Sequence, residues 1–195
     1  MIANQWKLGT VNIRGLNNQD KQDDIIEWHT SNNMTISSIT ETRTNEITNR
    51  FLKNHYKEVL IYATTDPKDI NGSGTAIIID KTLSAHIHNV QEVPGRAITL
   101  TLKFKNRITM AITSIYNKAN RDKRISQEII DHLKQNEHIE NQIIMGDLNE
   151  NQRTKGPILK HLGNNGNLVN IATITGQENQ PTWQRGTSKS TLDYI

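Results

Sequence analysis

The chain has 195 residues, which is enough for a substantial core, and we expect residues 1–195 to form a single domain. It contains no cysteine, which excludes disulfides, thiolate metal sites and cysteine nucleophiles. The net charge of +3 and the pI of about 9.1 are compatible with a polyanionic partner but do not establish one. The sequence has no signal-peptide pattern and no membrane-length apolar run, which predicts an intracellular protein without a membrane partner.

Strand-like and helix-like segments alternate in the first half of the chain. Strands are predicted at residues 6–13, 34–40, 59–63 and 75–79, and helices at residues 21–29 and 45–55. Residues 66–74 contain proline, asparagine and two glycines, and are expected to form a loop. The first two strands end beside Asn12 and Glu41.

The second half begins with a long β-rich region, residues 85–115. Its strands are predicted at residues 90–93, 97–104 and 108–115. Helices follow at 121–137 and 154–162, a buried strand at 142–145, and extended pieces from residue 181 and over 190–195. This mixed order favours an α+β fold with two stacked, mostly antiparallel sheets and outer helices over a regular parallel sheet.

The most informative short stretch is Gly146-Asp147-Leu148-Asn149, which follows three consecutive apolar residues. Consecutive apolar residues are typical of a short buried strand. Gly146 allows backbone angles that other residues resist. Asp147 and Asn149 are two residues apart, so an extended backbone projects both from one face. The alternative interpretation is a polar turn that merely closes a strand.

Several predicted strands end in a polar or ionisable residue. These residues are Asn12, Glu41, Tyr116, Asp147 with Asn149, and Asp193. Each has an ordinary role when taken alone, as a turn residue, a solvated strand end or a tyrosine at the rim of the core. If they converge, however, they form an oxygen-rich pocket, which suits Mg²⁺ or Mn²⁺.

Seven short motifs occur in a characteristic order along nearly the whole chain. They are Thr10 to Leu16, Glu41-Thr42-Arg43, Gly72 to Ala76, Ser114-Ile115-Tyr116, Gly146 to Asn149, Pro181-Thr182-Trp183, and Ser190 to Ile195. The ordered set resembles the endonuclease/exonuclease/phosphatase superfamily, which includes DNase I-like nucleases and apurinic endonucleases. Within it, the chain most resembles the endonuclease domain of LINE-type (non-LTR) retrotransposons.

The resemblance implies a four-layer αββα sandwich that hydrolyses phosphodiesters with a divalent metal. Glu41 would be the principal metal ligand, and Asn12 would help to hold the metal or the phosphate. Asp147 would orient or deprotonate the attacking water. Asn149 and Tyr116 would stabilise the phosphate and its transition state, and Asp193 would orient a catalytic histidine. Candidate contacts to nucleic acid or phosphate are Arg14, Arg43, Thr182, Trp183 and Ser190.

Two departures from the family pattern matter. Arg14 stands where many members carry an acidic residue, and a cation there cannot ligate Mg²⁺. The family also ends with a strand carrying Ser-Asp-His, whereas this sequence stops at Ile195. We therefore expect the last strand and the catalytic histidine to be missing, and the chain to be poorly stable and nearly inactive.

The leading hypothesis is a Mg²⁺-dependent endonuclease that nicks target DNA for retrotransposition. It would act in the nucleus and be fused to a downstream reverse transcriptase. A phosphatase of the same fold, acting on inositol phosphates or sphingolipids, is an alternative. A non-catalytic remnant that binds DNA or a protein is another. The basic cluster Arg121, Lys123 and Arg124 favours nucleic acid, although such a cluster can also be a solvated helix face.

Overall fold

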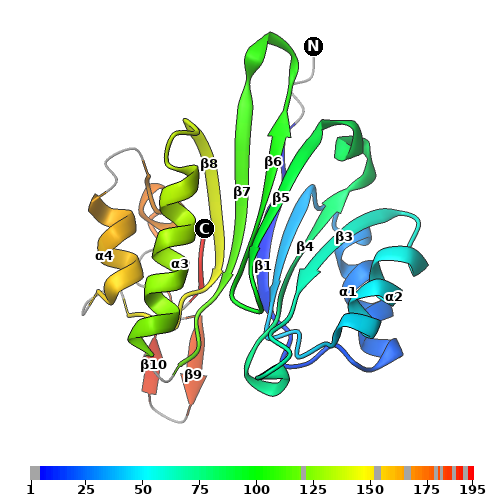
Figure 1. Cartoon of the computed structure of the whole chain (residues 1–195), viewed down its shortest axis with the longest axis horizontal. Helices are drawn as coiled ribbons and strands as arrows, with labels where there is room; N and C mark the ends of the chain where they lie inside the picture. Colours follow the sequence, from blue (N-terminus) through cyan, green and yellow to red (C-terminus); the bar gives the residue numbers. More distant parts are fainter. Residues whose placement is uncertain are drawn as a thin grey trace.

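Two β-sheets lie face to face, with helices covering the outer side of each (Figure 1). The computed structural model describes residues 5–119, 122–151, 155–164, 168–177, 180, 182–185, 188–190 and 193–195. In order, the first sheet contains β1 (Leu8–Asn12), β2 (Ile36–Thr40), β4 (Thr75–Asp80) and β3 (Val59–Thr64). The second contains β11 (Asp193–Tyr194), β8 (Asn141–Asp147), β7 (Thr109–Tyr116), β6 (Ala97–Lys103) and β5 (Ile87–Val93).

The helices divide between the two outer faces. The first sheet is covered by α1 (Gln19–Ser31) and α2 (Glu46–His55), and the second by α3 (Lys123–Asn136) and α4 (Pro157–Asn164) (Figure 1). Three of these helices begin at a polar residue whose side chain accepts a backbone N–H, namely Asn18, Asn45 and Asp122. Such N-caps satisfy amides that have no partner within the helix.

Three apolar clusters fill the spaces between the four layers. One lies between the first sheet and its helices and includes Ile25, Leu52 and Ile78. The central cluster joins the two sheets, and the third lies between the second sheet and its helices. The predicted α+β sandwich with outer helices is confirmed.

Each sheet contains one parallel strand pair, and these two pairs position the polar strand ends. β1 pairs in parallel with β2, and β7 in parallel with β8. The crossovers contain α1 and α3, because parallel neighbours need a long connection. Both carboxyl ends of a parallel pair lie at one edge, so Asn12 is opposite Thr40 and Tyr116 is opposite Asp147.

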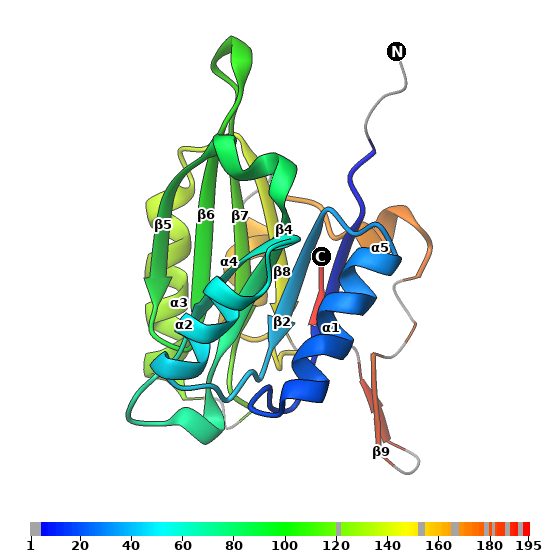
Figure 2. The same cartoon turned by 90° about the vertical axis from the view of Figure 1, so that its right-hand side faces the viewer.

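Shorter elements complete the described chain. Three are single-turn or two-turn 3₁₀ segments: η1 (Ile70–Gly72), η2 (Lys81–His86) and η3 (Lys105–Arg107). The prediction of continuous β-structure from residue 85 was wrong at its start, where η2 extends to His86. The remaining elements are α5 (Ile171–Ile174), β9 (Trp183–Arg185) and β10 (Ser188–Ser190). The β9–β10 hairpin projects from the end of the molecule opposite the β6–β7 turn (Figures 1 and 2).

Candidate active site

Asn12 connects the carboxyl ends of the two sheets. Its Nδ2 donates to Oδ2 of Asp147 at 2.9 Å, although the two residues are 135 positions apart. Its Oδ1 accepts the backbone N–H of Arg14 at 3.2 Å. This second bond fixes the amide orientation, so the N–H groups of Asn12 point toward the carboxylates. Burial raises the pKa of Glu41 and the Asn12 amide is among the groups that lower it, so Asn12 lies near both acids.

The backbone around Glu41 is held in an uncommon conformation. Glu41 has a φ of 54° and Arg43 a φ of 50°, in the left-handed region that non-glycine residues seldom adopt. The turn is held by bonds from Thr42 N to Gly74 O and from Arg43 N to Ser73 O, each 3.1 Å. A side chain at Gly74 would lie 2.2 Å from the Thr42 hydroxyl, so the glycine loop fits closely. Strain of this kind is typical of functional sites.

The Glu41 carboxylate is ionised and partly screened from water. Its side chain is 17% exposed, and Oε2 accepts from Nη2 of Arg43 at 2.6 Å. Burial by itself would raise its pKa. Hydrogen bonds from Asn12, Arg43 and Tyr116, together with the Arg43 charge, outweigh burial and lower the pKa below its ordinary value. The carboxylate therefore stays negative at neutral pH.

Tyr116 lies at the end of β7 with its ring buried. Burial raises its pKa, and the negative charges of Glu41 and Asp147 raise it further. The Arg96 guanidinium opposes this shift from a position 5.9 Å from the ring centroid. The phenol thus keeps its proton and acts as a hydrogen-bond donor.

Arg96 is a buried cation that sequence reasoning missed. Its Nη2 contacts Oδ2 of Asp69 at 3.0 Å, and its Nη1 donates to the Gly72 carbonyl at 2.6 Å. Lys118 reaches the same Asp69 oxygen at 2.7 Å. Hydrogen bonds from Lys118 and Arg96 lower the pKa of Asp69. The arginine thereby joins the 69–74 loop to Tyr116. The available signal was its position directly after Pro94-Gly95, between two predicted strands.

Gly146 allows β8 to deliver Asp147 to the cluster. It has a φ of 134°, and a β-carbon there would lie 2.0 Å from the Ile115 carbonyl oxygen. This confirms the prediction that the position needs angles that other residues resist. Asp147 Oδ1 accepts the backbone N–H of Asn149 at 3.0 Å, and Asn149 Nδ2 donates to the Asn117 carbonyl at 2.7 Å. Residues 146–149 therefore form a turn, as in the alternative interpretation, and the Asp147 carboxylate accepts a backbone hydrogen bond within that turn.

The structure brings together Asn12, Glu41, Tyr116, Asp147 and Asn149, and Arg43 joins them through its ion pair with Glu41. Arg14 is exposed and contributes its backbone N–H, and the Arg43 side chain is 41% exposed. Thr182 is also exposed. Trp183 and Ser190 lie on β9 and β10, and their side chains are outside the described parts. Asp193 pairs with Asp147 in the β11–β8 register, but its side chain is likewise outside them.

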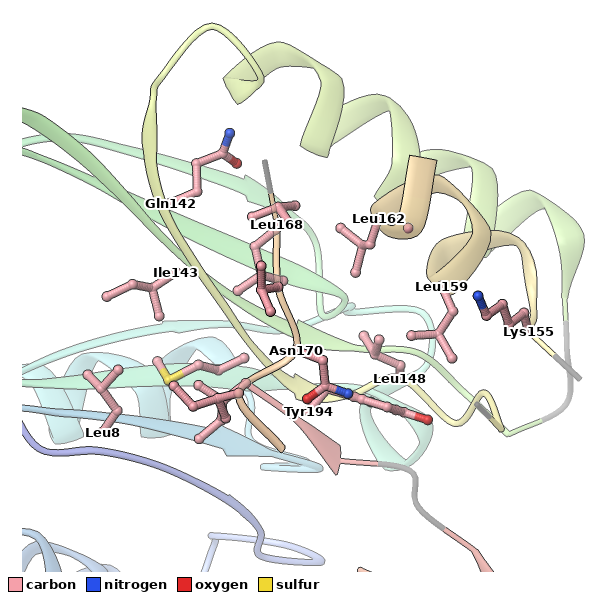
Figure 3. A pocket seen from close by; sticks show the side chains of 16 residues that line it. Leu8, Gln142, Ile143, Leu148, Lys155, Leu159, Leu162, Leu168, Asn170 and Tyr194 are labelled. Carbon is pink, nitrogen blue, oxygen red and sulfur yellow. The ribbon is translucent and has the colours of Figure 1, made fainter. Parts of the chain in front are cut away.

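A mostly apolar pocket lies elsewhere, beside residues 142–145 of β8 (Figure 3). It has a volume of about 290 Å³ and is lined mainly by aliphatic side chains, including Ile143, Leu159 and Leu162. Lys155 is its one charged lining residue. A pocket of this composition lacks the converging polar groups that chemistry on a phosphate needs, so the polar cluster is the candidate active site.

Comparisons with known proteins agree with this architecture. No family model matches the sequence, and no curated protein matches it. Among solved structures, the endonuclease domain of TRAS1, a telomere-specific non-LTR retrotransposon, superposes with a TM-score of 0.66 at 14% identity, covering 97% of this chain and 82% of that one. The AP endonuclease LMAP from Leishmania major gives a TM-score of 0.70 at 15% identity, covering 97% and 78%.

A third match carries the name of the fold. It is an endonuclease/exonuclease/phosphatase family protein from Leptotrichia buccalis C-1013-b, with a TM-score of 0.60 at 13% identity, covering 97% and 86%. The chain has the endonuclease/exonuclease/phosphatase fold. The resemblance in the ordered motifs therefore holds for the fold. The similar structures include endonucleases and a mannosyl-6-phosphatase, so nucleases and phosphatases share this fold.

The resemblance in the ordered motifs implies a divalent metal, and the donors of the cluster fit one. Glu41 and Asp147 supply carboxylate oxygens on either side of the Asn12 amide. Mg²⁺ is usually held by one or two carboxylates and keeps waters or substrate phosphate in its remaining positions. Within the described residues, no three His, Cys, Asp or Glu side chains form a metal-holding group. The donor set therefore suits Mg²⁺ or Mn²⁺ and does not suit a fully protein-ligated metal.

All seven histidines lie within the described residues, and each is placed away from this cluster. Two of them are buried, with His29 bonded to Ser37 and His132 to Thr99, both at 2.8 Å. The other five are near other partners or on the surface, namely His55, His86, His88, His138 and His161. The cluster thus contains no imidazole from these seven.

No helix in the described part of the chain is long and apolar enough to span a membrane.

Proposed function

We propose that this chain hydrolyses phosphodiester bonds in DNA with the help of a divalent metal. The supporting observation is the convergence of Asn12, Glu41, Tyr116 and Asp147 at the strand ends, where Asn12 donates to Asp147 and lies close enough to Glu41 to lower its pKa against the effect of burial. Two negative groups beside a protonated phenol and arginines form a site for a phosphate that carries a metal ion. The fold neighbours include two endonucleases, which favours a nucleic-acid substrate.

The chain's own residues divide the work between binding and proton transfer. Glu41 would hold Mg²⁺ or Mn²⁺, which when bound would polarise a phosphoryl oxygen and stabilise developing negative charge. Asn12, whose N–H groups point toward the carboxylates, would orient the acids and donate to the phosphate. Asp147 accepts a hydrogen bond from the attacking water and takes its proton. Tyr116, which keeps its proton, and the amide of Asn149 donate to the phosphate oxygens. Arg43 holds Glu41 in place and balances its charge.

A low turnover rate follows from the placement of the histidines. The proton for the leaving oxygen has no imidazole source among the seven histidines. We propose that in these 195 residues water supplies the proton, and we expect turnover well below the ~10 s⁻¹ that is common for enzymes. The chain should therefore be assayed at micromolar concentration over hours.

The finer role that we propose is target-site nicking for a non-LTR retrotransposon, next to a reverse transcriptase in the nucleus. It is supported by the ordered motifs and by the fold likeness to the TRAS1 endonuclease domain. Sequencing the 5′ ends of nicks made in a mixed-sequence plasmid tests this role. A preferred target is expected, and nicks spread evenly over all sequences would contradict it.

Conversion of supercoiled plasmid to nicked circles tests the main proposal. The product should appear with Mg²⁺ or Mn²⁺, disappear with EDTA, and be lost in Asp147→Asn. If the chain released phosphate from soluble phosphomonoesters faster than it nicked plasmid, the result would favour the alternative that it is a phosphatase of the same fold. DNA affinity without nicking, unchanged by Glu41→Ala or by EDTA, would favour the non-catalytic binding protein.

A further inference from the structure

A second pocket has Asn149 of the candidate active site among its lining residues. Its volume is about 500 Å³, and it lies between the loop after β8, the start of α3 and the start of α4. Asn117 and Asn149 line its inner end. Lys123, Lys155 and Lys160 line the rest, so three cations from three segments of the chain meet there. We call this site the lysine pocket.

The three lysines are available to an external anion. Each is exposed, and among the described residues none of them forms an ion pair. Glu150 is the one acid lining the pocket within the described residues, but its carboxylate is already engaged. Its oxygens accept the backbone N–H groups of Ile158 at 3.1 Å and Leu159 at 2.8 Å, which caps α4. The pocket therefore presents a net positive surface.

One polar atom at the inner end lacks a partner. Asn117 is 2% exposed, and its Nδ2 donates to the Leu148 carbonyl at 3.0 Å. Its Oδ1 is buried and has no hydrogen-bond partner among the described residues. A buried unsatisfied oxygen costs roughly 1–3 kcal/mol, so it marks a place where a bound water or ligand donor would be favourable. Asn117 and Asn149 both line the lysine pocket.

We propose that the lysine pocket binds the phosphate backbone of the DNA strand on one side of the scissile phosphate. This inference rests on the proposed function, because it assigns the path of the same substrate. Lysine contacts to phosphates release counterions and supply sequence-independent affinity. A phosphate held near Asn149 would place the next phosphates of the strand along Lys123, Lys155 and Lys160. A soluble phosphomonoester has no such continuation, so the pocket favours a polymer.

The molecule offers a matched basic surface as a control. At the opposite end of β6 and β7, Lys103, Lys105 and Arg107 are exposed around the β6–β7 turn, beside a pocket of about 670 Å³. Tyr116 ends β7, whereas this turn precedes it, so the full length of the strand separates the turn from the candidate active site. Replacing either set by glutamine removes three positive charges.

The test compares the two triple variants in DNA binding. Affinity for a fluorescent 20-base-pair duplex is measured by anisotropy with EDTA at several salt concentrations. The variant Lys123→Gln, Lys155→Gln, Lys160→Gln should bind roughly 10- to 100-fold more weakly at 100 mM salt, and its log–log salt slope should fall by about 2–3 units. The control variant Lys103→Gln, Lys105→Gln, Arg107→Gln should change affinity less than about threefold.

Equal loss of affinity in the two variants would overturn the inference, because net charge alone would then explain binding. An unchanged salt slope in the first variant would overturn it as well. These failures are separable from failure of the proposed function, which is judged by nicking in the wild type and its loss in Asp147→Asn. Because the chain has no cysteine, Lys155→Cys and Lys105→Cys provide single labelling sites. A photo-crosslinker at residue 155 should capture DNA, and one at residue 105 should not.

Discussion

Strand β8 has two ends with opposite characters. Its carboxyl end delivers Asp147, which bonds to Asn12 and to the Asn149 backbone. Its first half, through Ile143 and Met145, lines the apolar pocket (Figure 3). The polar end depends on fixed backbone angles and hydrogen bonds, whereas the apolar end depends on buried area. We therefore expect substitutions at one end to change chemistry and those at the other to change stability.

Asp147→Asn is the sharpest way to separate activity from stability. The amide cannot accept a proton from water, and removing a positioned general base typically costs 10²- to 10⁴-fold in rate. Plasmid nicking per folded molecule should fall by about that factor, and the loss of one of the two hydrogen bonds to the carboxylate should cost only about 1–3 kcal/mol of unfolding free energy. Asp131→Asn on exposed α3 serves as the control and should leave nicking unchanged. Equal nicking by Asp147→Asn and the wild type would exclude Asp147 as the base.

Gly146→Ala should cause the largest loss of stability at the polar end. The new methyl group would lie 2.0 Å from the Ile115 carbonyl oxygen, and the φ of 134° is unfavourable for alanine. Overpacking and strain together should cost about 3 kcal/mol of unfolding free energy. Gly163→Ala is the matched control in α4, since nothing lies within 4 Å of its added carbon. It should be neutral or stabilise the protein by up to about 1 kcal/mol in urea unfolding.

Two neighbouring residues of α4 allow the stability contribution of a fully buried side chain to be compared with that of a partly exposed side chain in the apolar pocket. Ile158 is fully buried, whereas Leu159 is partly exposed and lines the pocket. Ile158→Ala should cost roughly 3 kcal/mol in urea unfolding, and Leu159→Ala roughly 1 kcal/mol. Neither should change nicking per folded molecule. If Leu159→Ala cost as much as Ile158→Ala, the apolar pocket would be closed in solution.

Loss of stability between pH 8 and pH 5 should come from buried histidines, because the lowered pKa of Glu41 affects stability only at lower pH, below its ordinary value. Burial lowers the pKa of His29 and of His132 below the ordinary value of 6.5. In the unfolded chain both histidines become protonated as the pH falls through 6.5, whereas in the folded chain they stay neutral to a lower pH. Stability should thus be level above that pH and then fall by up to about 1.4 kcal/mol per pH unit for each histidine.

Urea midpoints between pH 8 and pH 5 measure this loss. The double variant His29→Gln, His132→Gln should start lower and show a flatter slope than the wild type. Replacing exposed His138 in the same way should leave the slope unchanged. If the double variant kept the wild-type slope of urea midpoint against pH, groups other than these two histidines would be responsible for the acid sensitivity.

Much of the polar end could be predicted from the sequence because its residues are the ends of strands. Asp147 and Asn149 follow an apolar run, and Asn12, Glu41 and Tyr116 each close a segment with strand periodicity. Their roles in catalysis remain predictions. The α+β sandwich followed from the order of the same segments together with the ordered motifs.

The remaining features depend on contacts between segments that no local pattern records. Arg96 becomes part of the site only through Asp69 and the Gly72 carbonyl, 24 to 27 residues away. The lysine pocket likewise gathers Lys123 and Lys160 from two helices whose exposed faces look ordinary in the sequence. Only the packing of α3 against α4 places these two side chains around one space.

The turn at Glu41 also has a consequence for hydrogen exchange. The amides of Thr42 and Arg43 lie outside any strand, yet both are bonded to the glycine loop, and the amides of Gly15 and Leu16 are bonded in turn to Glu41 and Thr42 at 2.7 Å. Irregular segments normally exchange their amide protons quickly because they open locally. These four amides should instead exchange as slowly as those of the neighbouring strands. The segment that carries the principal acidic residue would then open to solvent only together with the sheet that supports it.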